Sequence, residues 1–199
     1  MAQNNKTTNC RFALSVMANN YKTMILDALS AVDPASVVSF TDLLSTTYIG
    51  NLDSVLATVQ AVFTAVNDGK THITLEATIR PDANCDGLQW QSSVATPVSR
   101  NFLVHGKINL YPLGITDYQP IIDDISKLAR ECGVFVQNNN RQKPTTLQAI
   151  DLCGDVQDLF VFFTKTYECT AAVLIDFVIQ ISLSINSPSL SLDNNQGSF

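Results

Sequence analysis

A pattern that covers residues 41–79 returns at residues 149–183, and this repeat restricts the possible folds more than any other feature of the sequence. In each copy a short strand ends at a glycine, a helix follows, and another strand begins 22 positions after that glycine. Gly50 precedes His72 by this distance, and Gly154 precedes Asp176 by the same distance. Because a glycine interrupts a strand and the equal spacing leaves room for equal helices, the pattern predicts one structural unit used twice.

Further elements precede each copy of the pattern. In the first half, apolar and polar residues alternate over 10–17, helical spacing covers 21–32, and a strand follows over 37–40. The second half has a strand over 106–112, a helix over 117–132 and a strand over 133–138. Its last three elements are expected as a strand over 146–152, a helix over 156–167 and a strand over 173–185.

Each half therefore has the order β-α-β-β-α-β, which is the ferredoxin-like split motif. The predicted fold is α+β: tandem ferredoxin-like repeats with antiparallel sheets and helices on one face. The expected divisions are a first repeat over 10–83, a linker over 84–101, a second repeat over 102–187 and a flexible tail over 188–199.

The strands predict one apolar sheet face and one mixed face. Near His72, the side chains of Thr74 and Glu76 alternate with Ile73 and Leu75, so the polar ones share a face. A bare face of small and polar side chains usually meets another sheet or a partner. The other half of this chain or a second chain could provide that cover.

Composition excludes several classes of function. The net charge is −6 and the 12 basic residues are scattered, which argues against a nucleic-acid partner. No apolar run reaches the length of a membrane span, and the first residues do not have the pattern of a signal peptide. The five cysteines form no CxxC pair, so we expect free thiols and a cytoplasmic protein.

Catalytic motifs are missing from the sequence. Two histidines cannot form a three-histidine zinc site, and there is no HExxH, Walker or GxGxxG motif. Cys85 lies in the least regular segment, where a free thiol is a better interpretation than a nucleophile. We therefore predict a protein that is not an enzyme and needs no cofactor.

Short motifs along the chain resemble one known family. The motifs of the first half are RFALSVM at 11–17, TD followed by ST at 41–46, LDSV after Gly50, and His72. The motifs of the second half are LYPL at 110–113, GVFVQ at 133–137, GD at 154–155 and SINSPS at 184–189. In this order and spacing the chain resembles the bacterial YkoF-type proteins, which bind thiamine and its hydroxymethylpyrimidine half. The resemblance covers roughly Arg11 to Pro188.

The resemblance implies a tandem ferredoxin-like protein that is usually a homodimer and catalyses no reaction. It also implies a link to the uptake of thiamine precursors, with a permease as a candidate partner. Four positions depart from the family pattern. Ser15-Val16 replaces Tyr-Pro, which the second half keeps at 111–112, Asp176 replaces His, and Ile150 replaces Ser. These departures imply that the two halves differ as binding sites.

A pyrimidine with an exocyclic amine needs a flat surface and a few fixed donors and acceptors. The residues predicted to contact it in the first half are Asp42, Ser45, Thr46, His72 and Ser15. The candidates in the second half are Asn109, Tyr111, Gln137, Gln148, Asp151 and Asp176. The alternative for the first half is that Asp42 and Ser45 only form a turn and that His72 only ends a strand. The alternative for the second half is that its candidates form a sheet interface or a solvent-facing surface.

Two aromatic residues, Trp90 and Tyr118, could stack on a ring, although core or linker packing is the better explanation for both. The predicted function is a soluble, non-enzymatic binder of thiamine or its hydroxymethylpyrimidine moiety. The alternative function is a regulatory or scaffolding module that binds protein through its open sheet face.

Overall fold

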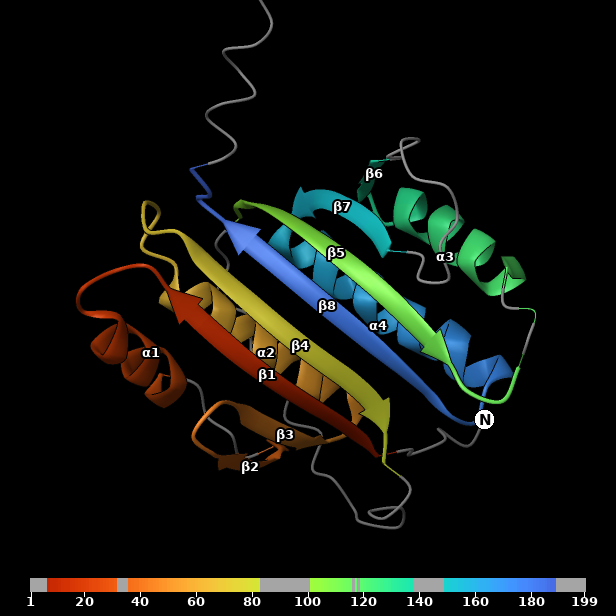
Figure 1. Ribbon diagram of the computed structural model, residues 1–199, viewed down its shortest axis with the longest axis horizontal. Helices are drawn as coiled ribbons and strands as arrows, with labels where there is room; N and C mark the ends of the chain where they lie inside the picture. Colours follow the sequence, from red (N-terminus) through yellow and green to blue (C-terminus); the bar gives the residue numbers. More distant parts are fainter. Residues whose placement is uncertain are drawn as a thin grey trace, which may run out of the picture.

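The strands of the two repeats form one continuous sheet (Figure 1). The computed structural model describes residues 7–31, 36–82, 101–115, 117, 119–137 and 149–188. The elements of the first half are β1 (Thr8–Val16), α1 (Tyr21–Ser30), β2 (Val38–Thr41), β3 (Thr46–Gly50), α2 (Leu52–Val66) and β4 (Ile73–Pro81). Those of the second half are β5 (Leu103–Pro112), α3 (Gln119–Glu131), β6 (Phe135–Gln137), β7 (Ala149–Asp155), α4 (Val156–Val173) and β8 (Phe177–Ile185).

The strand order confirms the predicted fold class. The eight strands lie in the order β2-β3-β1-β4-β8-β5-β7-β6, and each neighbouring pair is antiparallel. Each half contributes its strands in the ferredoxin-like order, with its last strand at one edge. Those two last strands, β4 and β8, pair with each other at the centre of the sheet.

The pairing of β4 with β8 relates the two repeats by a local twofold axis. Ala77 of β4 pairs with Ile181 of β8, and these positions are 104 apart in sequence, as are Gly50 and Gly154. Equivalent residues of the two repeats therefore meet at the axis. The repeats lie edge to edge, so among the described residues neither repeat covers the open face of the other, and a second chain or another partner is the expected cover.

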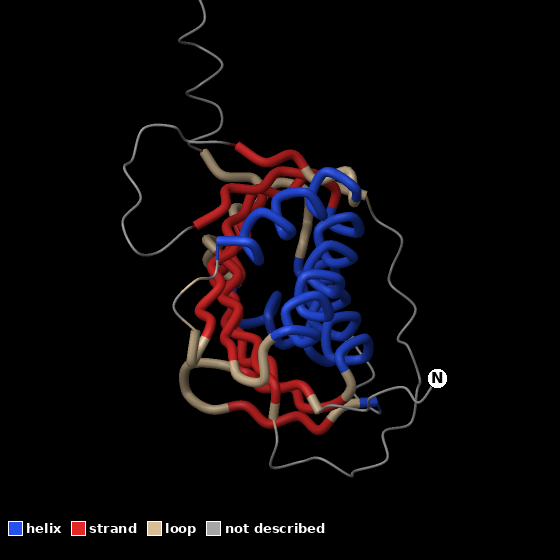
Figure 2. Tube along the Cα trace, turned by 90° about the vertical axis from the view of Figure 1, so that its right-hand side faces the viewer, coloured by secondary structure: helices blue, strands red, loops and turns tan. Residues whose placement is uncertain are grey.

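The helices cover one face of the sheet (Figure 2). The central helices α2 and α4 pack against each other across the repeat boundary, with α1 against α2 and α3 against α4. The buried layer between helices and sheet contains large side chains with less than 2% exposure, among them Phe63, Phe162, Phe163 and Phe177. A buried hydrogen bond from the Thr8 hydroxyl of β1 to the Tyr167 hydroxyl of α4, 3.2 Å long, also joins the two repeats.

The two central helices begin at side-chain caps. The Asn51 side chain accepts from the Ser54 amide at the start of α2, and Asp155 accepts from the Gln157 amide at the start of α4. The α2 helix ends before Gly69, whose φ of +81° is easily reached only by glycine.

Helix α4 is longer than the sequence predicted, and the expected strand over 173–185 is correspondingly shorter. The helix continues from Tyr167 to Val173, and β8 begins at Phe177. No glycine or proline interrupts residues 168–172. The added turn buries Thr170 completely, and its hydroxyl donates to the Thr166 carbonyl at 2.7 Å. Local burial therefore extends the helix into a segment whose apolar composition also suited a strand.

Gly106 of β5 makes room for its neighbours in β8. A Cβ at this position would lie 2.7 Å from Leu183 Cδ2 and 2.9 Å from the Ser182 carbonyl oxygen. We expect Gly106→Ala to lower the free energy of unfolding by about 1–3 kcal/mol, because this crowding requires a backbone shift. Urea unfolding followed by circular dichroism measures the change.

The matched control for this substitution is Gly154→Ala. The nearest atoms to a Cβ at Gly154 are those of Val134, at 3.6 Å, which is an ordinary contact distance. This control is expected to change stability by less than about 1 kcal/mol. Equal losses in the two variants would contradict the assignment of Gly106 to close packing.

Candidate functional site

The face opposite to the helices carries a row of polar side chains across both repeats. The strand register places Ala13, Glu76, Ser182, Lys107 and Asp151 side by side on β1, β4, β8, β5 and β7. Their neighbours along each strand on this face are small or polar as well, including Ser15 and Thr74, which pair directly. We call the polar surface that runs along β1, β4 and β8 on this open face the floor.

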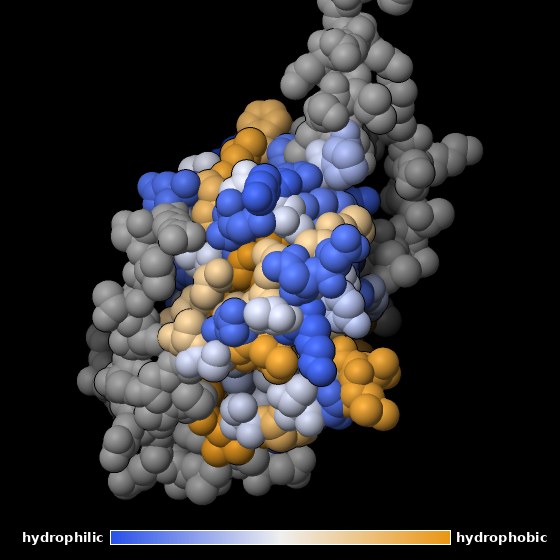
Figure 3. All heavy atoms as spheres, turned by 90° about the vertical axis from the view of Figure 1, so that its left-hand side faces the viewer, coloured by the Kyte–Doolittle hydropathy of each residue, from blue (hydrophilic) through white to orange (hydrophobic). Residues whose placement is uncertain are grey.

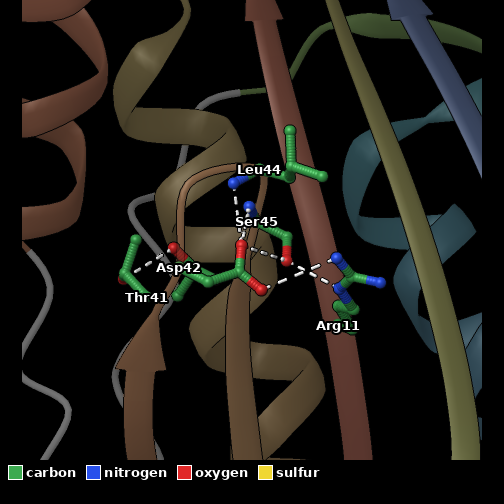
Figure 4. Close-up of polar contacts among 6 residues, drawn as sticks. Arg11, Thr41, Asp42, Leu44 and Ser45 are labelled. Carbon is green, nitrogen blue, oxygen red and sulfur yellow. Dashed lines mark hydrogen bonds and ion pairs between the residues drawn. The ribbon is translucent and has the colours of Figure 1, made fainter.

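At one side of this floor, Arg11 of β1 connects to the β2–β3 hairpin (Figure 4). Its Nε donates to the Ser45 hydroxyl at 2.6 Å, and its Nη2 lies 3.6 Å from Asp42 Oδ2. The other carboxylate oxygen of Asp42 accepts from the Leu44 and Ser45 amides at 2.7 and 2.8 Å. Arg11 therefore ties the hairpin to β1.

These contacts affect the protonation of Asp42. The hydrogen bonds from the Leu44 and Ser45 amides lower the pKa of this exposed carboxyl, and the Ser45 hydroxyl and Arg11 lower it further. Asp42 is thus an anion at neutral pH whose Oδ1 is used by its own turn. The turn interpretation of Asp42 and Ser45 accounts for their observed contacts.

His72 lies at the end of the floor, just before β4. Its Nε2 is 3.0 Å from the Ser184 hydroxyl, and its Nδ1 is 3.1 Å from Met17 Sδ. Because a thioether sulfur can only accept, the geometry fits a proton on Nδ1 and a Ser184 hydroxyl that donates to Nε2. His72 and the hairpin are about 15 Å apart, since they are separated by two strand spacings and four residues along the sheet.

The structure therefore divides the residues predicted for the first half. Asp42 and Ser45 lie together in the hairpin, and Ser15 lies near His72 on the open face. Thr46 lies with neither of these two groups. It is 6% exposed, pairs with Phe12 and shares a hydrogen bond with Thr41. Its hydroxyl lies on the helix side, away from the open floor.

In the second half, polar side chains mostly bind one another. Lys107 Nζ lies 3.5 Å from Asp151, and the Tyr111 hydroxyl donates to Gln180 at 3.1 Å. Asn109 pairs with Gln180 on the same face. Asp176 is exposed, and its carbonyl accepts from the Leu113 amide. These contacts occupy the region equivalent to the open floor of the first half.

The remaining predicted residues are only partly described. Gln137 belongs to β6 and pairs with Asp151, while its side chain lies outside the described residues. Gln148, Trp90, Tyr118 and Cys85 also lie outside them.

A cysteine–histidine pair lies on the open face of the second half. Cys153 Sγ is 3.9 Å from His105 Nε2, and burial raises the pKa of the Cys153 thiol. A protonated thiol is a poor nucleophile, so this pair lacks the activation that covalent catalysis needs. Among the residues placed by the structure, no group of three or more potential ligands could hold a metal ion.

Three residues that contact the floor were not among the predicted site residues: Glu76, Ser182 and Ser184. The alternation of β4 placed Glu76 on the open face, which was the available signal in the sequence. The two serines belong to β8 of the other repeat, and their closeness follows from the β4–β8 register. Nothing within either strand indicates that register.

Asp68 organises the turn that leads from α2 to His72. Its carboxylate accepts from the Thr71 and Lys70 amides at 2.7 and 3.0 Å and from the Thr71 hydroxyl at 2.7 Å. The hydrogen bonds from the Thr71 and Lys70 amides lower the pKa of Asp68 from 3.8 to about 2.

We expect the Asp68 carboxyl to titrate near pH 2 in a carbon-13 NMR titration. Because its pKa is lower in the folded state, its stabilising effect is present above the unfolded value of 3.8 and is lost as the pH falls toward about 2. Thr71→Val removes one donor and keeps the amides, so it should move the midpoint part of the way back toward 3.8. A wild-type midpoint near 3.8 would contradict these hydrogen bonds.

Together these features define the class of protein as a tandem ferredoxin-like α+β protein with an open polar sheet face. No helix in the described ranges is long and apolar enough to cross a membrane. The chain belongs to the YKOF-related family, whose profile matches residues 7–87 and 103–190. It is 26% identical over 188 residues, 90% of each chain, to the Bacillus subtilis (strain 168) protein named "Putative HMP/thiamine-binding protein YkoF". The resemblance seen in the sequence motifs is thereby confirmed.

Proposed function

We propose that this protein binds thiamine or its hydroxymethylpyrimidine moiety, without catalysing a reaction, on the open face of the first repeat. The observation that carries the proposal is the polar floor beside β4. The chain belongs to the YKOF-related family, and a relative is named as a putative binder of this ligand. On this floor Glu76 and His72 border the small side chains of Ala13, Ser15 and Thr74. The same binding would serve the uptake or salvage of thiamine precursors in the cytoplasm, with handover to or from a permease.

The chemistry of the floor suits an aminopyrimidine. The exocyclic amine is a donor, and the Glu76 carboxylate is an acceptor that is exposed on the open face. The hydroxyls of Ser15 and Thr74 can meet the ring nitrogens or the hydroxymethyl group. The small side chains leave space for a ring to lie flat, and the negative charge of the chain favours the cationic thiazolium of thiamine.

Within this proposal the other predicted residues have lesser roles. Asp42 and Ser45 form the rim of the floor, where Arg11 holds them. The site of the second repeat, with Asn109, Tyr111, Gln137 and Asp176, binds more weakly because Tyr111 is engaged with Gln180.

Isothermal titration calorimetry with thiamine and with hydroxymethylpyrimidine tests the proposal, and pyridoxine serves as the control ligand. Saturable binding is expected for the first two and none for the control. Thermal stability should rise with ligand, by about 2.7 kcal/mol at a hundredfold excess over Kd. Absence of both effects at millimolar thiamine would reject the proposal.

The uncovered sheet face also favours a homodimer. The hairpin between β2 and β3 exposes Leu43 and Leu44, which are 101% and 79% accessible. Figure 3 shows apolar groups among polar ones on this side of the molecule. A second copy of the chain would cover the face and the leucines together. Sedimentation velocity tests this: a species of twice 21.7 kDa is expected, and a monomer at all concentrations would reject the homodimer.

A further inference from the structure

We infer that the pyrimidine site of the first repeat is composite, with Ser182 and Ser184 of the second repeat as the positioning residues for Glu76 and His72. The inference rests on the proposed function and adds to it the dependence of one repeat on the other. Both serines lie on β8, which is the neighbour of β4 at the repeat junction.

The first contact fixes the carboxylate of Glu76. Ser182 pairs with Glu76 in the register, and its hydroxyl donates to Oε2 at 2.5 Å. Glu76 is otherwise exposed, and a solvated glutamate would move among several rotamers. Holding one carboxylate oxygen turns the other, Oε1, into an acceptor of defined position for the exocyclic amine.

The second contact fixes the tautomer of His72. The Ser184 hydroxyl lies 3.0 Å from Nε2, while Met17 Sδ takes the side of Nδ1. Since the sulfur only accepts, the neutral ring fits a proton on Nδ1 and a Ser184 hydroxyl that donates to Nε2, which leaves the lone pairs of Ser184 available beside the floor. A free histidine exchanges between tautomers and ring orientations, whereas contacts at both ring nitrogens favour one orientation and one tautomer of His72.

Among the described residues, the first repeat does not make the equivalent contacts to the second repeat. The local twofold axis relates Glu76 to Gln180 and Ser182 to Thr78, yet Gln180 accepts from Tyr111 of its own repeat. It also relates His72 to Asp176 and Ser184 to Arg80, and no ion pair joins those two described residues. The second repeat therefore positions groups in the first, and the first does not position the corresponding groups in the second.

The test uses the full-length chain with Ser182→Ala, Ser184→Ala and the double variant, titrated calorimetrically with thiamine. Each single variant is expected to bind about threefold to tenfold more weakly, because a hydrogen bond that orders a binding group is lost. Ser39→Ala, at an exposed strand position on β2, is the matched control and should bind as wild type. The unfolding midpoints of all variants are recorded so that a loss of folding is recognised.

Two readouts separate positioning from a general structural role. Ser182→Thr and Ser184→Thr keep the hydroxyl on a β-branched side chain that suits a strand, so each should restore the affinity. Nitrogen-15 shifts of the His72 imidazole should report a proton on Nδ1 in wild type and a mixture of tautomers in Ser184→Ala.

The outcomes distinguish the inference from the proposed function. If wild type binds thiamine and the alanine variants bind equally well, the composite site is rejected and the function remains. If the threonine variants fail to restore an affinity lost with alanine while folding is intact, positioning by the hydroxyls is also rejected. If wild type binds neither thiamine nor hydroxymethylpyrimidine, both the function and the composite site are rejected.

Discussion

Phe63→Ala is expected to lower the free energy of unfolding by about 3–5 kcal/mol, which is a large part of the total stability of a domain. Phe63 is fully buried on α2, and its ring lies 6.2 Å from that of Phe102, just before β5. Its removal leaves a cavity between the central helix of the first repeat and the start of the second. Urea unfolding followed by circular dichroism and by fluorescence measures the loss.

The matched control is Phe135→Ala on β6. This phenylalanine is 64% exposed at the edge of the sheet, so its truncation should change stability by about 0.5 kcal/mol or less. Because Phe63 lies at the junction, both probes should shift together in the Phe63 variant. Separate transitions for the two probes would contradict a single cooperative unit.

Glu76→Gln is expected to weaken thiamine binding by a factor of about ten or more. The substitution keeps the shape of the side chain and the acceptor for Ser182, but it removes the charge opposite the exocyclic amine. A hydrogen bond to a charged group contributes about 1.5–3 kcal/mol, which corresponds to a tenfold to hundredfold change in Kd. Calorimetric titration of the folded variant with thiamine measures this change.

Glu168→Gln on α4 is the control for the loss of one negative charge. Glu168 is exposed and belongs to the helix layer, so this variant should bind thiamine as wild type does. Unchanged affinity in the Glu76 variant would place the ligand elsewhere than on the floor beside β4. An equal loss in both variants would instead indicate a long-range effect of net charge.

The fold could be predicted from the sequence because its main signals are local. The repeated spacing between Gly50 and His72 defines a strand–helix–strand unit, and alternation assigns an apolar face to each strand. The pairing of β4 with β8 could not be predicted in this way. Alternation determines which face of a strand is buried, whereas the edge that a strand offers to another repeat depends on the whole sheet.

The candidate site was harder to predict than the fold for a related reason. Asp42 and His72 were grouped because both lie at strand ends, yet the strands β3 and β1 lie between them in the folded sheet. Thr46 was grouped with them by its place in the motif, although its register with Phe12 turns it to the helices. Distances across a sheet follow from register, and the register between β4 and β8 places Ser182 beside Glu76.

The local twofold axis has a consequence for how the two repeats associate. If the repeats were separate polypeptides, each would carry a free edge nine residues long, β4 in one and β8 in the other. Such an edge recruits any complementary strand, including that of an identical copy, and the resulting assembly would dissociate on dilution. Joining the repeats in one chain makes the pairing intramolecular, so its strength depends on an effective concentration set by the connection and not on the amount of protein in the cell.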